Sequence, residues 1–267
     1  MNDIVTIRAS ALGDFLDCPA RAEAKHLMNM RTPSGGGAIL GRAIHKSTAV
    51  YDQSGIDKSG LTADDAAGAA VDVIHSPDDD VVWDEDDSPA QAESIALALH
   101  SLYCKEIAPK QDYAAVEVQC DRLEIHDIGL ALTGTTDRVR RVADGYGIAD
   151  LKSGKRAVSA DGIVETKGAA YQIGVYELLA ERASGVPITA SAQIVGLQVA
   201  KTAKGQRVAT SAPVSGAREV LVGSGDSPGV LEVVARMIHS GAFPGNPRSM
   251  LCHKKFCPIF NRCKFRM

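Results

Sequence analysis

The sequence lacks any long apolar segment. Nowhere does it contain an uninterrupted run near the roughly 18 to 20 apolar residues that a membrane helix needs. Charged residues interrupt the start of the chain at Asp3, Arg8 and Asp14, so the apolar core of a secretory signal peptide is missing as well. We therefore expect no membrane span and place the protein in the cytoplasm.

The sequence also lacks a strong net charge. Its formal value of -4 argues against a protein that binds polyelectrolytes indiscriminately. The charges are nevertheless uneven: residues 72–93 hold nine acidic residues and no Lys or Arg, whereas residues 248–267 hold six Lys or Arg and no acidic residue. We interpret the acidic run as a solvated loop, or alternatively as a charge mimic that covers a basic groove. The basic segment is the better candidate for nucleic-acid contact.

With 267 residues, of which 45% are hydrophobic, the chain can bury one large core or two small ones. It contains no internal repeat. Periodicity and capping residues predict helices over residues 20–28, 38–51, 61–74, 88–107, 165–183 and 229–239. They predict strands over residues 114–120, 130–135, 138–142, 147–152, 192–199 and 207–213, the first four as an antiparallel meander. This order indicates an α/β core with a helical N-terminal lobe, and glycines 35–37 indicate a flexible link or a close approach of two segments.

Two acids and a lysine stand out in the strand region. The segment GTTDRV contains Asp137, and thirteen residues later the segment ADLKSGK contains Asp150 and Lys152. Because side chains alternate along a strand, Asp150 and Lys152 point to one face, and a turn at Asp144-Gly145 brings Asp137 roughly opposite them. Carboxylates suit Mg²⁺ or Mn²⁺, and Lys152 could orient or deprotonate an attacking water. An exposed ion pair at a strand end is the alternative interpretation of Asp-x-Lys by itself.

Two helical motifs accompany these residues. The segment GRAIH ends in His45, and the segment QIGVY carries Gln172 and Tyr176 at a spacing that puts both on one helical face. A lone helical histidine is more often packed or at the surface than a ligand, and the Gln and Tyr could simply face solvent and the edge of the core. Glu117, in the strand before Asp137, could be a further acid of this group, but we expect a surface position on its strand.

The six cysteines have no export signal beside them, so we expect thiols rather than disulfides. Three of them, Cys252, Cys257 and Cys263, lie in the short basic segment, which has little capacity for a core of its own and is a usual setting for a metal or cluster. A fourth ligand is needed, and Cys18, which precedes a proline as Cys257 does, is the candidate. His253 keeps a zinc site open as an alternative. We expect the remaining two, Cys104 and Cys120, to be ordinary buried thiols.

In their order along the chain, these motifs resemble the PD-(D/E)XK nucleases of the RecB type. One remote cysteine followed by three near the other end resembles the iron-sulfur staple of the AddB and CRISPR-associated exonuclease families, although the first gap here is four residues where those families often show two. The resemblance implies one nuclease domain over residues 1–267, with a mainly helical part (1–110), a nuclease core (111–215) and a cysteine-rich segment (240–267). Its fold would be restriction-endonuclease-like, with a central mixed sheet flanked by helices and an iron-sulfur staple joining the N- and C-terminal segments.

The resemblance also implies roles for the residues named above. His45, Asp137, Asp150 and the carbonyl of Leu151 would hold Mg²⁺ or Mn²⁺, Lys152 would activate water, and Gln172 and Tyr176 would position the strand. A 4Fe-4S cluster, or alternatively Zn²⁺, would be held by Cys18, Cys252, Cys257 and Cys263.

The implied activity is that of a DNA exonuclease acting on single-stranded DNA or DNA ends in phage or bacterial recombination, repair or CRISPR-type processing, with recombination or CRISPR adaptation proteins as partners. One alternative is a non-catalytic DNA-binding or assembly protein on the same fold, against which the intact acids and lysine argue. A structure-specific endonuclease is another, although no separate recognition domain is visible.

Overall fold

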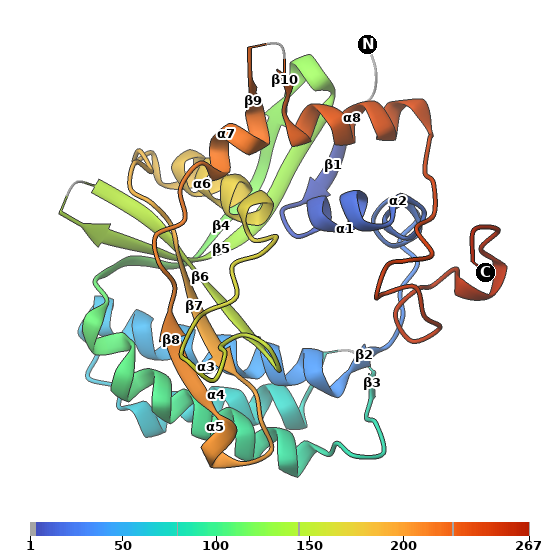
Figure 1. Cartoon of the computed structure of the whole chain (residues 1–267). Coiled ribbons are helices and arrows are strands. Elements are labelled where there is room, and N and C mark those ends of the chain that lie inside the picture. The colour runs from blue at the N-terminus through green and yellow to red at the C-terminus, as the bar shows by residue number, and fades with distance from the viewer. Residues whose placement is uncertain (1–3, 79, 144, 226, 267) are drawn as a thin grey trace.

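The computed structural model describes residues 4–78, 80–143, 145–225 and 227–266. These residues form a six-stranded mixed sheet with helices on both of its faces (Figure 1). The strands of the sheet are β1 (Val5–Arg8), β4 (Tyr113–Ile125), β5 (Leu130–Val142), β6 (Gly145–Gly154), β7 (Gln193–Gln198) and β8 (Arg207–Thr210).

The long strand β5 organises the sheet. Along one edge it pairs antiparallel with β4 over nearly its whole length. Along the other edge its first half pairs in parallel with β1, and its second half pairs antiparallel with β6. Beyond β6, the sheet continues with β7, which is parallel to β6, and with β8, which is antiparallel to β7. The second edge of β5 is therefore a fork, where β6 turns away and β1 takes its place.

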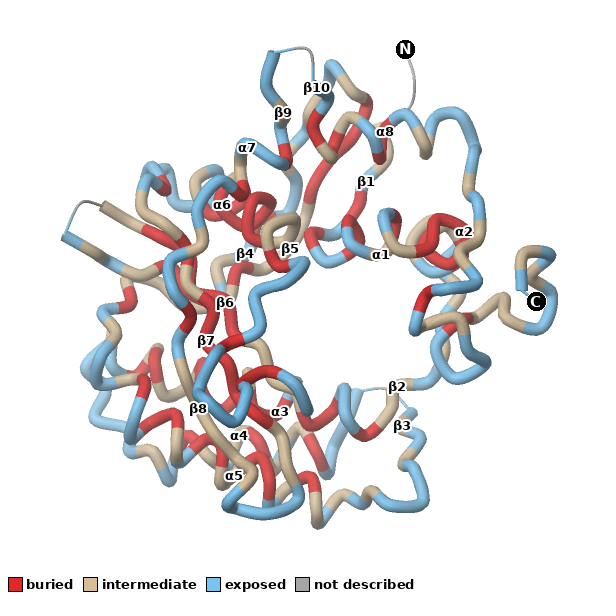
Figure 2. The backbone as a smooth tube through the Cα atoms, viewed as in Figure 1, coloured by how far each residue is buried: buried red, intermediate tan, exposed pale blue. Residues whose placement is uncertain are grey.

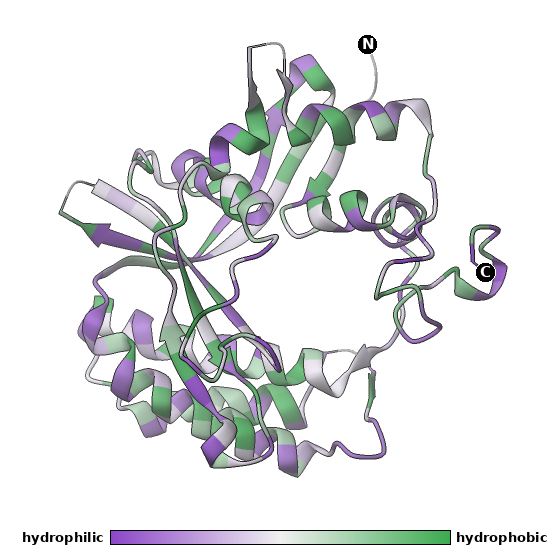
Figure 3. Ribbon diagram, in the orientation of Figure 1, coloured by the Kyte–Doolittle hydropathy of each residue, from purple (hydrophilic) through white to green (hydrophobic). Residues whose placement is uncertain are grey.

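Helices cover the two faces of the sheet and enclose two separate cores, seen as the buried segments of Figure 2. One face carries α3 (Gly36–Asp57), α4 (Ala63–His75) and α5 (Pro89–Glu106). The other core lies under α1 (Ala11–Asp17), α6 (Ala170–Ser184), α7 (Ala217–Val222) and α8 (Val230–Ser240). Successive side chains of β6 point to opposite faces of the sheet, so this strand contributes to both cores: Ile148 packs into the α6 core and Leu151 into the α3 core. Figure 3 shows the same pattern as apolar residues along the central strands and the helix sides that face them.

Local capping fixes where several helices begin. Thr62 and Asp65 form a reciprocal capping box before α4, and the Ser88 hydroxyl accepts the Gln91 N–H before α5. At the start of α3, a Cβ on Gly36 would lie 2.6 Å from a ring carbon of Trp83. The predicted close approach at the glycine run is therefore present.

The shorter elements are α2 (Pro19–Ala22), β2 (Ser34–Gly35), β3 (Val81–Val82), β9 (Gly223–Ser224), β10 (Ser227–Pro228), a π-helical turn over Glu23–Leu27, and 3-10 turns over Ala108–Lys110, His126–Ile128, Ala203–Gly205 and Phe260–Arg262. The C-terminal segment beyond α8 runs back beside α1 and α2 (Figure 1). None of the helices in the described part of the chain is long and apolar enough to span a membrane.

Three sequence predictions need correction. The strands predicted over residues 130–135 and 138–142 are one continuous strand, β5. The helix predicted from residue 165 begins only at Ala170, because Glu165 instead accepts the Lys167 N–H and Gly168 has a positive φ of 79°. The first hundred residues are not purely helical, since they supply β1 and the pair formed by β2 and β3. In the turn predicted at Asp144-Gly145, Asp144 lies outside the described residues.

Candidate active site

The carboxylates of Asp137 and Asp150 lie at the fork of the sheet. The ladder between β5 and β6 ends at the pair Arg138 and Ala149, so Asp137 and Asp150 are the first residues beyond it on their strands. Since the ladder has ended, the N–H of Leu151 is free to donate elsewhere, and it donates to Asp137 Oδ2 at 2.8 Å. The divergence of β5 and β6 thus places Asp137 and Asp150 on opposite sides of the fork. The main-chain N–H of Leu151 on β6 holds the Asp137 carboxylate on β5.

Asp150 is almost fully buried, with 1% of the residue exposed. Its Oδ2 makes no hydrogen bond with any described residue, although Lys152 Nζ lies 2.9 Å away and hydrogen-bonds Oδ1 at 3.3 Å. Burial raises the pKa of Asp150 to about 6, against the lowering effect of Lys152 and with a further raising effect from Asp137. Oδ2 is therefore ion-paired with the Lys152 ammonium, and a buried carboxylate oxygen of this kind requires a cationic partner.

His45 reaches the fork from the facing helix α3. Its Nδ1 lies 3.6 Å from Asp137 Oδ2, and its side chain is 30% exposed. Burial by itself would lower the pKa of His45, but the neighbouring Asp137 carboxylate raises it above the usual value, with a further contribution from Asp150. One turn earlier in α3, Gly41 allows the helix to approach β6, since a Cβ there would lie 3.2 Å from Ser153 Oγ.

Lys152 is held by a short chain of hydrogen bonds from α6. Its Nζ donates to Gln172 Oε1 at 2.6 Å, and Gln172 Nε2 donates to the Tyr176 hydroxyl at 2.6 Å. The spacing of four residues aligns Gln172 and Tyr176 on one helical face, as the sequence predicts. Tyr176 is buried, which raises the pKa of its hydroxyl and keeps it neutral. The structure therefore brings the predicted Gln and Tyr to the predicted lysine.

Glu117, for which the sequence left open a place among the acids and favoured a surface position, lies beside the candidate site. It is exposed, as expected, but it lines the same open cleft as His45 and Asp137. The β4 register pairs Val116 with Arg138, so Glu117 stands across from Asp137, and its φ of 49° is unusual for a residue with a side chain. The pairing of β4 with β5, which contains two register shifts, sets this position.

The donor set at the fork fits a hard divalent cation in its chemistry: carboxylate oxygens, one of them buried and without a hydrogen bond. The side chains are not, however, preassembled around one point. Within the described ranges no group of three or more His, Cys, Asp or Glu residues is arranged to hold a metal ion. The carbonyl of Leu151 remains a predicted ligand; its side chain is buried in the α3 core, so only its main chain faces the acids.

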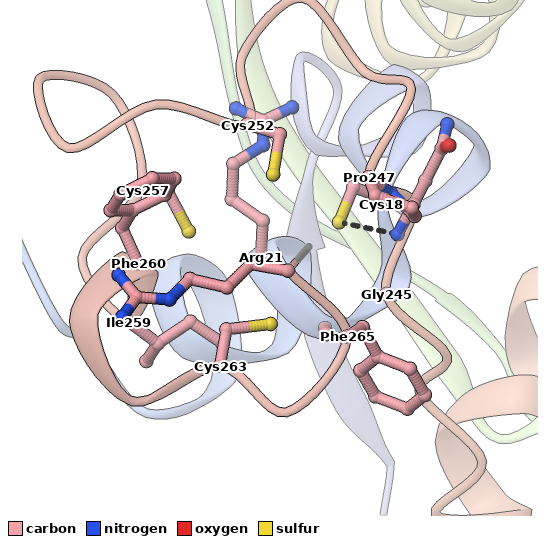
Figure 4. A pocket seen from close by; sticks show the side chains of 13 residues that line it. Cys18, Arg21, Gly245, Pro247, Cys252, Cys257, Ile259, Phe260, Cys263 and Phe265 are labelled. Atoms are coloured by element: carbon pink, nitrogen blue, oxygen red, sulfur yellow. Dashed lines mark hydrogen bonds between the residues drawn. The ribbon is translucent and has the colours of Figure 1, made fainter.

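The four predicted cysteine ligands line one small cavity, although Cys18 is far from the other three in sequence (Figure 4). Cys18 and Cys257 are buried, and the sulfur atoms of all four point into the cavity. The pKa of Cys257 is raised by burial and by the three neighbouring sulfurs. Cys104 and Cys120 are buried thiols elsewhere in the two cores, as predicted.

Hydrogen bonds tie the two chain ends together around this cavity. Asn246 donates its N–H to Cys18 Sγ at 3.3 Å and its side-chain amide to the Asp17 carbonyl at 2.8 Å. The Asp17 carboxylate accepts from Ser249 at 2.6 Å and from the buried Arg21, which also lines the cavity (Figure 4). The four thiols therefore lie where hydrogen bonds already hold the N-terminal and C-terminal segments together.

A mixed sheet between helical layers, with two acids and a lysine on neighbouring strands, is the arrangement of restriction-endonuclease-like enzymes. The family model of the PD-(D/E)XK nuclease superfamily matches residues 6–264, and the chain belongs to this superfamily. Its members are typically metal-dependent nucleases, use divalent metals such as Mg²⁺, and have DNA as the implied substrate. A search of curated proteins finds no match.

Proposed function

We propose that the protein is a metal-dependent DNA exonuclease that hydrolyses phosphodiester bonds on single-stranded DNA or at DNA ends. The observation that carries this proposal is the strand fork, where Asp137 and Asp150 face each other and Lys152 Nζ lies 2.9 Å from the buried Asp150 Oδ2. An ordinary surface ion pair does not bury its carboxylate, whereas Asp150 is almost fully buried.

Asp137, Asp150, His45 and the Leu151 carbonyl would hold the cation. When bound, a divalent ion supplies charge neutralisation at the phosphate and lowers the pKa of a water. Lys152 orients the attacking water or takes its proton. Gln172 Oε1 accepts a hydrogen bond from the Lys152 ammonium and thereby fixes the direction of the lysine side chain, while the neutral Tyr176 hydroxyl accepts from Gln172 and orients it.

The exonuclease assignment rests on the branch-specific features. Gln172 and Tyr176 correspond to the Gln-x-x-x-Tyr motif of the RecB-like branch. Their hydrogen bonds connect both residues to Lys152, so both orient the lysine side chain.

We further propose that Cys18, Cys252, Cys257 and Cys263 hold a 4Fe-4S cluster, with Zn²⁺ as the alternative occupant. Thiolates are the usual ligands of both. Support comes from the common cavity of the four sulfurs and from its location between the chain ends, far in sequence from the acids of the fork. The role of the cluster would be structural, because none of its ligands belongs to the carboxylate site.

The deciding experiment compares end-labelled linear and circular single-stranded DNA with Mg²⁺, Mn²⁺ or EDTA. We expect shortening of the linear strand with either metal, no cleavage of the circle, and no reaction in EDTA. Cleavage of the circle would make the protein an endonuclease. Binding without cleavage under all metal conditions would favour the non-catalytic alternative, and Asp150→Asn serves as the matched inactive control.

A further inference from the structure

A second cavity lies beyond the carboxylate site, between the start of α3, the start of α5 and the end of β6. Its volume is about 440 Å³, and its lining includes Gly37, Trp83, Ile95, Lys155 and Lys201. Most of the wall is apolar, and the two lysines, Lys155 and Lys201, also line it. The fork residues do not line this cavity, so it is a separate feature of the molecule.

Trp83 is the single tryptophan of the sequence, and its indole is fixed at one wall. A Cβ on Gly36 would lie 2.6 Å and 2.8 Å from two carbons of the ring, so this position must be glycine for the helix and the indole to pack. Trp83 is nevertheless only half-buried. A large aromatic surface is thus held in place and remains accessible from the cavity.

Two lysines and one acid line the cavity, and residues 84–87, which directly follow Trp83, are all acidic, so Lys155 is the group that is available to an anionic ligand. Asp87, which also lines it, lies 3.9 Å from Lys201 Nζ, and the nearby Asp84 is paired with Lys255 at 2.7 Å. The Lys155 ammonium, by contrast, makes no hydrogen bond or ion pair within the described residues. Helices α3 and α5 both begin at the cavity and direct the positive ends of their dipoles toward it.

The cavity and the carboxylate site lie along the same two elements, α3 and β6, although the cavity shares no lining residue with the cleft at His45 and Asp137. Ser153 and Gly154 at its wall directly follow Lys152 on β6. On α3, Gly37 lies eight residues before His45, which corresponds to about 12 Å along a helix. A strand whose scissile phosphate lies at Asp150 would therefore need a few linked nucleotides to place one of its bases at Trp83.

We propose that this cavity binds an unstacked base of a single-stranded DNA substrate, with the base on the Trp83 ring and a phosphate at Lys155. The proposal rests on the proposed nuclease function and specifies its substrate. A base inside a duplex is stacked and paired on both sides and cannot enter such a cavity, whereas single strands commonly bind by base stacking on aromatic side chains. The apolar wall receives the base and the unpaired lysine receives the backbone.

Trp83 provides its own fluorescence signal for the test. Asp150→Asn protein, which cannot cleave, is titrated with a short oligothymidylate and with an abasic oligonucleotide of the same length. We expect quenching of the tryptophan emission by the oligothymidylate and little change with the abasic strand. Trp83→Ala should weaken binding about 5- to 100-fold, the range that the loss of one stacked base produces. Trp83→Phe should retain most of the affinity.

Two further variants keep the proposal testable if Trp83→Ala misfolds. Gly37→Leu introduces a side chain into open space within the cavity, since nothing lies within 4 Å of a Cβ there, and it leaves the indole in place. It should weaken binding as Trp83→Ala does, and Val82→Ala, at the exposed end of β3 directly before Trp83, is the control. Lys155→Gln should reduce the salt dependence of binding, and Lys167→Gln, also an exposed lysine of the loop between β6 and α6, should not.

Cleavage assays separate failure of this inference from failure of the proposed function. With Asp150 intact, Gly37→Leu should raise KM for single-stranded DNA and leave kcat nearly unchanged. Normal KM in Gly37→Leu and Trp83→Ala, together with unquenched fluorescence, would overturn the base-binding cavity while the nuclease stands. Absence of cleavage by the wild-type protein with any metal would overturn the nuclease, and quenching by the oligothymidylate alone would still support the cavity.

Discussion

The Arg138 guanidinium donates a hydrogen bond from Nε to Asp52 Oδ2 at 2.7 Å, and this pair fastens α3 to the strand that carries Asp137. Neither side chain exceeds 2% exposure. Tyr103 donates to the same oxygen at 2.7 Å, and Arg138 also donates to the main-chain carbonyl of Asp137 at 2.8 Å. The distance between His45 on α3 and Asp137 on β5 therefore depends on a buried ion pair next to the site.

Breaking this pair should destabilise the fold strongly. Asp52→Asn leaves the buried Arg138 charge without its partner, and we expect a loss of about 3 to 5 kcal/mol in the free energy of unfolding, measured by chemical denaturation. The exposed pair of Arg141 and Asp112 is the control: Asp112→Asn should cost less than about 1 kcal/mol. An equal effect of the two substitutions would contradict the structural role of Asp52. The double variant Asp52→Leu/Arg138→Met should recover part of the loss.

Replacement of Asp150 and replacement of Lys152 should affect cleavage and metal binding differently. Asp150→Asn keeps the shape but removes the charge that binds the cation, so cleavage should fall by orders of magnitude while DNA binding persists. Lys152→Ala should abolish cleavage and leave Mn²⁺ affinity, measured by calorimetry, at least as high, because it removes a competing cation from Asp150. Asp161→Asn, an exposed acid in the following loop, should behave as wild type. Near-normal turnover of Asp150→Asn would sink the assignment.

The hydrogen-bonded chain behind Lys152 should affect turnover more than binding. Tyr176→Phe removes the hydroxyl that accepts from Gln172, and Gln172→Ala removes the acceptor of the lysine proton. We expect kcat to fall about 10-fold or more in Gln172→Ala, and less in Tyr176→Phe, with KM little changed. Steady-state kinetics decides this, and a rise in KM at constant kcat would instead indicate that these residues contact DNA.

The cysteine cavity should govern metal content and the stability of the chain ends. Cys263→Ala should lose iron and the broad visible absorbance of an iron-thiolate cluster, and should become sensitive to proteolysis. Clipping Cys18 to Cys252 closes a loop of more than two hundred residues, an effect on the order of 4 to 5 kcal/mol in the chain-entropy model. Cys120→Ala should retain the metal. Stoichiometric zinc without iron after anaerobic purification would replace the cluster by Zn²⁺, and unchanged metal content in Cys18→Ala would remove Cys18 from the ligand set.

Glu177 should make stability depend on pH near neutrality. Burial raises the pKa of Glu177 to about 7, despite Arg218 at 3.9 Å. The folded state thus holds this proton more tightly than the unfolded state, and the free energy of unfolding falls as the pH rises through roughly 4.5 to 7. Glu177→Gln should therefore be more stable than wild type at about pH 8, by about 1 to 3 kcal/mol, and gain nothing at about pH 4.

Glu181 offers the matched control for that experiment. It binds the same Arg218 at 3.1 Å, but it is only partly buried, and its hydrogen bonds from Ile188 N–H and Arg218 lower its pKa. Glu181→Gln should consequently reduce stability at about pH 8, the opposite sign. Equal signs for the two variants would contradict the burial argument.

Relations within one element, or across one turn, followed from the sequence. Alternation on a strand put Asp150 and Lys152 on one face, a four-residue helical spacing aligned Gln172 with Tyr176, and a hairpin brought Asp137 across from Asp150. Backbone geometry alone fixes such relations, because they depend on rise and twist over a few residues. The same local rules misjudged residues 165–169, where side-chain contacts of the loop outweigh the helical pattern.

Other relations existed only in the tertiary structure. The strand order decided that β6 leaves β5 at Ala149, which buried Asp150 and left its Oδ2 without a hydrogen bond. The pairing of β4 with β5 decided that Glu117 stands across from Asp137, and helix packing brought the start of α3 to Trp83. The sequence determined which groups the protein possesses; packing between segments far apart in the chain decided their distances and burial, because those depend on the whole fold rather than on local geometry.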